Sequence, residues 1–472
     1  MSESELLGQL EECLGPTGLL AAEADMAGYS HDLSNARGGR VVGVARPASA
    51  SEVADIVRLC GQAGVPITPR GGGTGLSGGA TPVAGASLVL SFERMRTIRS
   101  IDPISNHIVV EAGVTLYAAQ QAAIQAQRQL GLDHGGAGSS QIGGNLSTNA
   151  GGNNVIRYGM ARDQVLGLEV VLADGRLLEF LSPLRKNNAG YDLKGVFLGS
   201  EGTLGLITAA TLRLRPAAHS RATMLVGLQG IGAVMSFFER TQSAIGDSLT
   251  AVELIPRAAV EQVIKRFPDT REPFAQSCAW ALLVEAECAS QFFDLDAAME
   301  DLFVHAQQAG EVVDGNFAAS QAQRATFWTL RERIAHVMIE SPICLKMDTA
   351  VPIARIPQFL EHATRATALA LPGCRPIPFG HVGDGNIHFN VLGPEGMDAT
   401  AFDTHRATLA RAVEDCATAL DGTVSAEHGI GLLKKDALVR MRSDAERSVM
   451  ARIRSALDPS GLLNPGKVFD AS

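Results

Sequence analysis

The sequence predicts an α+β protein with a glycine-rich first part and a second part in which strands alternate with long helices. Three observations support this prediction. Glycine accounts for 50 of the 472 residues and is clustered within 71–79, 135–159, 199–205 and 380–385. After Pro216 glycine becomes scarcer and longer apolar elements begin. Clustered glycine allows a backbone to pack closely around a ligand, so we expect a ligand site in the first part.

Composition and charge exclude several classes of protein. Hydrophobic residues make up 46% and charged residues 19%, which is typical of a soluble globular chain. Forty Lys and Arg against fifty Asp and Glu give a net charge of -10, which argues against nucleic acid and against a basic membrane-binding face. The seven cysteines show no C-x-x-C spacing, so neither an iron–sulfur cluster nor a zinc knuckle is expected.

The first residues, the hydropathy and the cysteines favour a cytoplasmic protein. The first residues, MSESELLGQLEECLG, carry acids where a signal or transit peptide would carry bases. No run of eighteen apolar residues is present, so we expect no transmembrane segment. An odd number of scattered cysteines also suits a reducing compartment.

The first elements surround a glycine loop. Residues 49–64 form an expected helix that begins with a Ser49/Glu52 capping box and ends at Gly64, and 65–68 form an expected strand. The loop that follows contains G-x-G-x-x-G at 73–78, the spelling of a Rossmann dinucleotide site. A strand at 86–92 comes next instead of a helix, so the Rossmann interpretation fails. The alternatives are a backbone nest for a diphosphate and a glycine-rich surface turn.

Two more segments add to this part. Residues 139–159, SSQIGGNLSTNAGGNNVIRYG, mix glycine with Ser, Thr and Asn, which suits an extended ligand that needs many hydrogen bonds. Residues 198–214 combine a tight turn with an apolar strand. Between them, 168–180 predict a hairpin with Asp174-Gly175 at its turn.

The second part is expected to be an α+β domain. Strands are predicted at 251–255, 280–288 and 343–351, and helices at 231–244, 290–309, around 318–338, and at 356–370. In 379–392, His381 and His388 flank a Gly-Asp-Gly-Asn turn, and Glu427 and His428 follow in SAEHGIG. Two imidazoles and a carboxylate suit Zn²⁺ with open positions for substrate. The competing interpretation is a pair of buried, hydrogen-bonded histidines.

The three glycine segments together resemble the FAD-binding domain of the vanillyl-alcohol oxidase/para-cresol methylhydroxylase (PCMH) type. The resemblance implies a non-covalent FAD, with the first loop around its pyrophosphate and the other segments along the rest of the cofactor. The residues that it implies for FAD binding are Pro69, Arg70, Gly71, Gly72, Gly73, Thr74, Gly75, Leu76, Ser77, Gly78, Gly143, Gly144, Asn145, Ser147, Thr148, Asn149, Gly151, Gly152, Tyr158, Gly159, Glu201, Gly202, Ile207 and Asn464.

GHVGDGNIH, SAEHGIG and the closing DPSGLLNPGKVF resemble the C-terminal half of the FAD-dependent D-2-hydroxyacid dehydrogenases. This family includes D-lactate dehydrogenases, the flavin subunit of glycolate oxidase and D-2-hydroxyglutarate dehydrogenase, and SAEHGIG is closer to the hydroxyglutarate branch. The resemblance implies an FAD domain at 1–216, an antiparallel α+β substrate (cap) domain at 217–424 and a helical segment at 425–472 that returns to the flavin.

The resemblance also implies roles for individual residues. Zn²⁺ or a similar divalent metal would be held by His381, His388 and Glu427, and His428 would be the catalytic base. Asn390, Arg331 and Lys346 would bind the substrate. The family's threonine one helical turn after the arginine is Ala335 here, which weakens the case for hydroxyglutarate itself.

The chemistry follows from the residue types. Oxidation of a 2-hydroxy acid needs the hydroxyl proton removed while hydride passes from Cα to flavin N5. A metal would acidify the hydroxyl and His428 would accept its proton, while Arg331 and Lys346 would hold a carboxylate. For Arg331 the competing interpretation is a solvated helix charge. For Lys346 it is a structural ion pair with Asp348, two residues along the same expected strand.

Several alternatives remain open at this point. The substrate can be another D-2-hydroxy acid, such as D-lactate, glycolate or D-malate. A non-catalytic flavin subunit is a weaker alternative, because the proposed ligands and base are all present. The chain has no second cofactor motif, so electrons would pass to an external acceptor, electron-transferring flavoprotein by resemblance or a quinone. A homodimer is compatible with the sequence.

Overall fold

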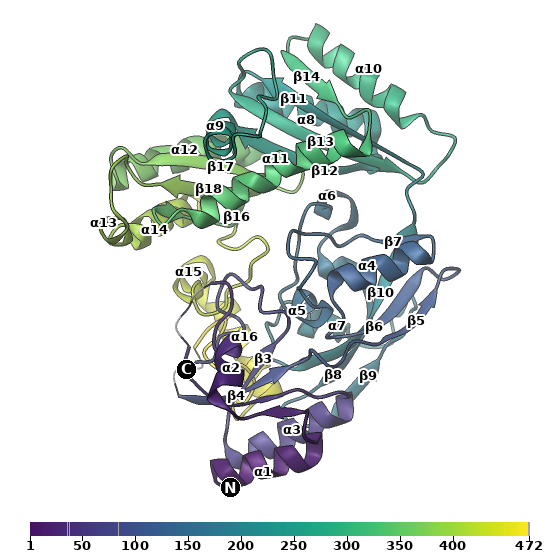
Figure 1. The fold of residues 1–472 in the computed structure, drawn as a ribbon, viewed down its shortest axis with the longest axis vertical. Coiled ribbons are helices and arrows are strands. Elements are labelled where there is room, and N and C mark those ends of the chain that lie inside the picture. The colour runs from purple at the N-terminus through teal and green to yellow at the C-terminus, as the bar shows by residue number, and fades with distance from the viewer. Residues whose placement is uncertain (35, 37, 84, 471–472) are drawn as a thin grey trace. The chain divides into compact units, whose positions relative to one another are not determined.

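The computed structural model describes residues 1–472 except 35, 37, 84 and 471–472 (Figure 1). The chain divides into two compact units. The first contains residues 1–152, 159–217 and 427–472, and the second contains 153–158 and 218–426. In the described part of the chain, no helix combines the length and the apolar character needed to cross a membrane.

The first unit contains a small sheet with the strand order β1-β2-β4-β3, formed by Leu19–Leu20, Arg40–Ala45, Ala86–Ser91 and Ile67–Arg70. Strands β2 and β3 both run parallel to β4. The helices α1 (Glu3–Leu14) and α3 (Ala50–Ala63) pack together beside this sheet. The predicted helix is confirmed: Ser49 caps α3 by accepting from the Glu52 N–H, and Gly64 ends it with φ 65°. The described residues between β3 and β4 contain no helix, as the sequence predicted.

A second sheet of the first unit has the order β5-β6-β10-β8-β9, and β7 pairs with the end of β10. These strands are Ile98–Asp102, His107–Glu111, Leu206–Pro216, Val165–Val171 and Leu177–Phe180, with β7 at Arg128–Leu130. The predicted hairpin is β8-β9, and Gly175 takes a left-handed φ of 77° at its turn. Helices α4 (Leu116–Gln125) and α5 (Ile142–Ser147) share the core of this sheet.

Four further helices are described in the first unit. They are α2 (Glu23–Met26), α7 (Lys194–Phe197), α15 (Lys435–Met441) and α16 (Asp444–Leu457). The chain ends in a loop in which Leu463 pairs with Ile67 of β3. The last segment therefore joins the small sheet beside the glycine loop.

The second unit is built on a sheet with the order β14-β11-β13-β12-β17-β18-β15, and β16 also pairs with β18. Its strands are Asp314–Phe317, Ser220–Leu228, Trp280–Cys288, Leu249–Pro256, Arg375–His381, Asn386–Leu392 and Cys344–Leu345, with β16 at Thr349–Ala350. All the pairings are antiparallel. The short helix α6 (Val155–Tyr158) belongs to this unit and contacts β12.

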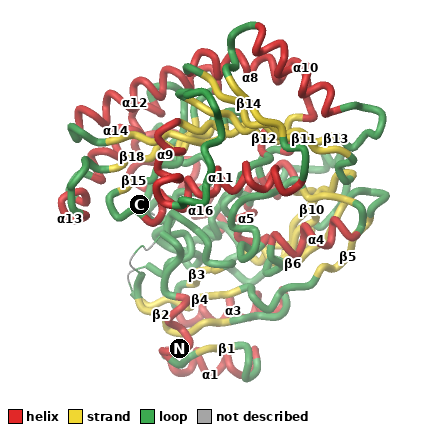
Figure 2. The backbone as a smooth tube through the Cα atoms, turned by 45° about the horizontal axis from the view of Figure 1, so that its top comes forward, coloured by secondary structure: helices red, strands yellow, loops and turns green. Residues whose placement is uncertain are grey.

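Helices cover both faces of this sheet (Figure 2). One face packs against α8 (Ile231–Ile245), α10 (Leu295–Gln308), α12 (Ile356–Ala370) and α14 (Arg406–Thr418), with α13 (Ala399–Asp403) nearby. The other face packs against α9 (Arg257–Arg266) and α11 (Gln321–Glu340). This second face carries the polar residues described below.

Two predicted elements differ from the structure. Helix α10 begins at Leu295 rather than at 290, because the Asp294 side chain caps it by accepting from the Ala297 N–H. The strand predicted at 343–351 is broken into β15 and β16. Between them the Met347 N–H donates to the side chain of Asn390 on the neighbouring strand β18 rather than to its backbone.

Candidate functional site

The glycine loop between β3 and β4 offers backbone donors. Among the described residues, none of the N–H groups of 71–79 donates a hydrogen bond to a protein acceptor. Ser77 and Gly78 are nevertheless buried, and buried N–H groups in folded proteins are almost always paired. A loop with several N–H groups that lack a protein acceptor suits an anionic ligand, and a diphosphate fits it.

The second glycine segment lies against this loop. A Cβ on Gly72 would come within 2.0 Å of the Ser139 carbonyl oxygen, so only glycine allows the two backbones to approach this closely. A Cβ on Gly71 would lie 3.5 Å from Cα of Gly144. The first two segments that the sequence assigned to FAD are therefore neighbours in the first unit.

Two predicted FAD residues hold other parts of the first unit in place. The Glu201 carboxylate accepts from the N–H groups of Ile430 (2.7 Å) and Gly431 (2.8 Å), directly after Glu427 and His428 in sequence. Burial raises the pKa of Glu201, and these two N–H donors oppose that shift. Asn464 donates from Nδ2 to the carbonyl oxygens of Gly79 and Glu201.

The other predicted FAD residues divide between the units. Tyr158 lies in the second unit, whereas the rest lie in the first. Arg70 donates to the carbonyl oxygens of His31 and Gly28, so its guanidinium braces the loop before β2. The unpaired loop donors and the close glycine approaches fit an FAD diphosphate.

The predicted histidine pair lies in a β-hairpin of the second unit. Strands β17 and β18 pair so that Phe379 faces His388 and His381 faces Asn386. The backbone doubles back as the spacing required, and the two imidazole rings lie 5.5 Å apart, centroid to centroid. A nitrogen of one ring lies within 4.8 Å of a nitrogen of the other. This separation allows both histidines to bind one ion.

A residue that the sequence analysis missed, Glu253, connects this hairpin to α11. Glu253 lies on β12 opposite His381 of β17, is fully buried, and places Oε1 2.5 Å from Nδ1 of His381. Its Oε2 accepts from Nε of Arg331 at 2.5 Å. A carboxylate in the apolar stretch LTAVELIP was the available signal, because an unpaired buried charge is costly.

The two partners change each other's protonation. Burial alone lowers the pKa of His381, but the Glu253 carboxylate outweighs burial and raises that pKa to about 9. Burial alone raises the pKa of Glu253, but Arg331 and His381 outweigh it and hold that pKa well below its usual value. Because Glu253 faces Nδ1, the Nε2 nitrogen of His381 is the one suited to a metal.

Arg331 is not a solvated helix charge. Its side chain is 10% exposed, and its guanidinium carbon lies 4.6 Å from the centre of the Phe379 ring. Stacking and the Glu253 contact together fix the orientation of the guanidinium. Since Nε is used by Glu253, a substrate carboxylate would have to bind through Nη1 and Nη2.

The other predicted substrate residues differ in their surroundings. Asn390 lies on β18 and is buried, and its Oδ1 accepts from the Met347 N–H at 3.3 Å. Lys346 is exposed, and Asp348 is buried and accepts from Nδ2 of Asn386 at 3.0 Å. An exposed Lys346 beside a buried Asp348 that bonds to Asn386 does not favour the alternative of a structural Lys346–Asp348 pair.

Glu427 and His428 begin the last segment of the first unit. Nε2 of His428 lies 3.6 Å from Oε1 of Glu427, and both side chains are partly exposed. Oε2 of Glu427 would lie 3.1 Å from a Cβ on Gly151, so this carboxylate borders the second glycine segment.

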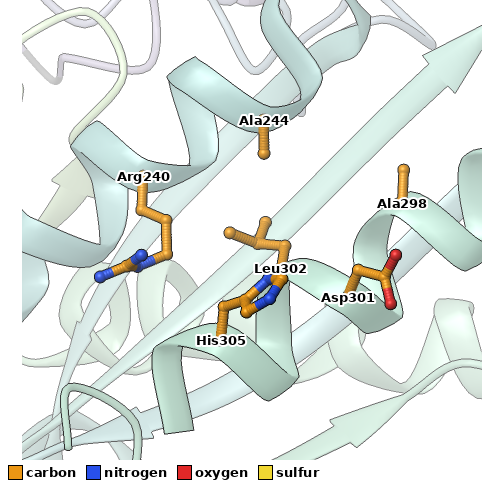
Figure 3. Close-up of a pocket in the computed structure, with 6 residues that line it drawn as sticks. All are labelled: Arg240, Ala244, Ala298, Asp301, Leu302 and His305. Atoms are coloured by element: carbon orange, nitrogen blue, oxygen red, sulfur yellow. The ribbon is translucent and has the colours of Figure 1, made fainter. Parts of the chain in front are cut away.

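A pocket elsewhere in the second unit contains none of these residues. It lies between α8 and α10, has a volume of about 270 Å³, and is lined by Arg240, Ala244, Ala298, Asp301, Leu302 and His305 (Figure 3). Arg240 forms an ion pair with Glu311 at 2.8 Å. His381, His388 and Arg331 do not line this pocket, so we assign the pocket no role in the chemistry.

Comparison with known protein families identifies an FAD binding domain and a second domain in the chain. Residues 41–181 match an FAD binding domain, and residues 217–468 match the C-terminal domain of FAD linked oxidases. Among solved structures, the chain resembles p-cresol methylhydroxylase with a TM-score of 0.78 at 15% identity, over 99% of this chain and 97% of that one. It also resembles alkyldihydroxyacetonephosphate synthase, with a TM-score of 0.75 at 16% identity, over 98% of this chain and 85% of that one. The PCMH-type fold predicted from the sequence is confirmed.

Curated relatives narrow the family. The chain is 34% identical to D-2-hydroxyglutarate dehydrogenase of Stutzerimonas stutzeri over the whole of both chains. It is 36% identical to the enzyme of that name from Xanthomonas citri, over 100% of this chain and 98% of the relative. For the mitochondrial enzyme of Bos taurus the identity is 35%, over 90% of this chain and 76% of the relative. The chain therefore belongs to the FAD linked oxidases, as an FAD-dependent oxidoreductase of the group that contains the D-2-hydroxyglutarate dehydrogenases.

Proposed function

We propose that the protein oxidises a D-2-hydroxy acid to the 2-oxo acid, with D-2-hydroxyglutarate as the first substrate to test. The observation that carries this proposal is the buried Arg331, held by Glu253 on the same sheet face as the histidine pair. A rigid, stacked guanidinium suits the planar carboxylate of a hydroxy acid, and the neighbouring histidines suit a metal beside its hydroxyl.

The proton and the hydride leave the substrate separately. When bound, FAD supplies the acceptor for the hydride from Cα. His428 accepts the hydroxyl proton, and its neighbour Glu427, 3.6 Å away, stabilises the imidazolium that forms. Arg331 holds the substrate carboxylate and so fixes the direction of the Cα–H bond. Lys346 adds a second positive charge, and Asn390 can donate to the substrate from Nδ2.

We infer that a divalent metal such as Zn²⁺ takes part, with His381, His388 and Glu427 as its ligands. When bound, the ion lowers the pKa of the substrate hydroxyl. The support is the ligand-like distance between the two imidazoles and the Glu253 carboxylate behind Nδ1 of His381, the usual support for a metal-binding histidine. Metal binding requires Nε2 of His381 to be unprotonated, so affinity should rise with pH.

Two points concern substrate and electron acceptor. Ala335 lies one turn after Arg331 on α11 and offers no hydroxyl for the far carboxylate of hydroxyglutarate. The alternative substrates are therefore D-lactate or glycolate, which have no second carboxylate, or D-malate, whose second carboxylate lies closer to the hydroxyl. We propose that an external acceptor, an electron-transferring flavoprotein or a quinone, reoxidises the flavin.

Anaerobic bleaching of the flavin tests this function. The purified yellow protein is mixed with D-2-hydroxyglutarate, D-malate, D-lactate or glycolate, before and after chelation, while the visible absorbance is followed. We expect one D-acid to bleach the flavin, the L-enantiomer of a chiral substrate to have no effect, and chelation to prevent the reaction until metal is restored. Bleaching that survives thorough metal removal would refute the metal, and no bleaching by any D-2-hydroxy acid would refute the substrate class.

A further inference from the structure

The closing segment of the chain contains a buried lysine without a partner. Lys467 is 0% exposed, and its Nζ has no hydrogen-bond partner among the described residues. A lone buried ammonium is costly and normally has an anion beside it. We propose that Lys467 binds the diphosphate of FAD and supplies a positive charge beside the glycine loop; this inference rests on FAD binding and not on the proposed substrate.

The neighbours of Lys467 place it beside the glycine loop. Asn464, three residues earlier, donates to the Gly79 carbonyl oxygen at 3.0 Å. Val468, the next residue, donates its N–H to the carbonyl oxygen of Gly431. A Cβ on Gly431 would come within 2.1 Å of the Ser77 carbonyl oxygen, so this backbone in turn touches the loop. Contacts on both sides of Lys467 therefore reach residues 77–79.

The acids that influence Lys467 already have other partners. Asp32 and Glu201 both attract the ammonium, and burial still lowers the pKa of Lys467 to about 8. Asp32 accepts from Oγ of Ser34 and from the N–H groups of Ser34 and Ala80. Glu201 accepts from two backbone N–H groups. Neither acid forms a hydrogen bond with Nζ of Lys467.

These two acids also border the loop. A Cβ on Gly75 would lie 3.2 Å from Oδ2 of Asp32, and a Cβ on Gly79 would lie 3.5 Å from Oε2 of Glu201. The other charged groups that influence Lys467 are the cations Lys435 and Arg454. Lys435 is paired with Asp470, and Arg454 donates to the carbonyl oxygens of Lys467 and Phe469. Of the three cations Lys435, Arg454 and Lys467, only the ammonium of Lys467 has no protein acceptor among the described residues.

The loop supplies donors that complement the ammonium. None of the N–H groups of 71–79 has a protein acceptor among the described residues. Several amides and one ammonium converging on a phosphate resemble the way that nests and lysine bind phosphates elsewhere. Val468 has a φ of 67°, which is unusual for a β-branched residue and is typical of ligand sites, so the backbone here is held in a strained form beside Lys467.

The proposed contact between Lys467 and the diphosphate can be tested by comparing FAD with riboflavin, which has no phosphate. The apoprotein is titrated with FAD and with riboflavin, and flavin fluorescence gives each Kd. We expect Lys467→Met to weaken FAD binding by about 10- to 100-fold, the range for loss of one charge-assisted hydrogen bond, and to leave riboflavin unchanged. Lys467→Arg should restore much of the FAD affinity. Lys435→Met, which removes a neighbouring positive charge, is the matched control and should change FAD affinity by less than about threefold.

A labelling experiment on the unmodified protein covers the case in which Lys467→Met does not fold. Because Lys467 is buried, acetylation is followed over hours, so that local opening of the structure exposes the amine. Mass spectrometry then measures the reactivity of Lys467 in the apoprotein, with FAD, with ADP and with riboflavin. Protection by FAD and ADP but not by riboflavin supports the proposal. Equal loss of FAD and riboflavin affinity, or equal protection by riboflavin, would overturn it. Substrate turnover enters neither readout, so failure of the proposed function would leave this result intact.

Discussion

Glu253 and His381 face each other across the adjacent strands β12 and β17, and Oε1 of the carboxylate lies 2.5 Å from Nδ1 of the imidazole. The same carboxylate holds Arg331. One buried acid therefore orients a proposed metal ligand and a proposed substrate ligand together. The two functions should respond together when Glu253 is changed.

We expect Glu253→Gln to lower metal affinity by about 10- to 100-fold, the usual effect of losing a carboxylate behind a metal-bound histidine. Metal content after dialysis against a graded chelator measures it. The variant should also unfold more easily, because Arg331 loses its buried partner. Glu285→Gln is the control, since Glu285 is a buried acid of the adjacent strand β13 that bonds to Thr223 and Trp328. Equal metal loss in both variants would contradict the specific role of Glu253.

Arg331→Lys tests carboxylate binding. Lysine keeps the charge but cannot contact Glu253 and fork onto a carboxylate with one planar group, so KM should rise by about 10- to 100-fold. The change in kcat should be smaller, which steady-state kinetics with the identified acid would show. Arg333→Lys is the matched control, because Arg333 lies two residues along α11 and pairs with Asp269 and Thr270. A KM unchanged in Arg331→Lys would remove Arg331 from substrate binding.

The raised pKa of His381 predicts a pH-dependent stability of the metal-free protein. The folded pKa of about 9 exceeds the ordinary histidine pKa of 6.5, so the contribution of His381 is complete below pH 6.5 and is lost as pH rises through 9. The difference in unfolding free energy between the wild type and His381→Asn should therefore shrink by roughly 3 kcal/mol from pH 6 to pH 10. Urea unfolding of both proteins in chelator measures this difference. A difference independent of pH would show that Glu253 and His381 do not share a proton.

Local patterns predicted most of the elements because each is encoded in contiguous residues. The apolar periodicity of 356–370 gives the bounds of α12, and Asp174-Gly175 gives the turn between β8 and β9. The exclusion of a Rossmann unit was also correct, since β4 follows the glycine loop directly. The break between β15 and β16 was missed because the Met347 N–H bonds to the side chain of Asn390, a residue on another strand.

The sequence predicted only those site residues that belong to a short local motif. His381 and His388 are close in sequence, and their hairpin could be expected from the glycine turn between them. Glu253 meets them through strand pairing that no local pattern reveals. Lys467 was missed for the same reason, because its burial depends on contacts between the closing segment and a loop near residue 77.

Lys346→Met separates substrate binding from folding. Lys346 is exposed, so its removal should change the free energy of unfolding by less than about 0.5 kcal/mol. If it binds a substrate carboxylate, KM should nevertheless rise several-fold, and added salt should reduce the difference from the wild type. Urea unfolding and kinetics at two ionic strengths test this. A stable variant with an unchanged KM would leave Arg331 as the sole cation for the acid.

Glu201→Gln tests whether the Glu201 carboxylate holds the segment that carries His428. The carboxylate accepts from the N–H groups of Ile430 and Gly431, two and three residues after His428, and glutamine would weaken these charge-assisted bonds. We expect faster hydrogen exchange at those two amides and a lower kcat, because the base would be less well positioned, with KM little changed. Thr203→Val is the control: the Thr203 hydroxyl donates to the nearby Ser200 carbonyl oxygen, so the exchange at 430 and 431 should stay slow. If Glu201→Gln lowered kcat while both amides kept wild-type protection, Glu201 would act on the cofactor and not on the segment carrying His428.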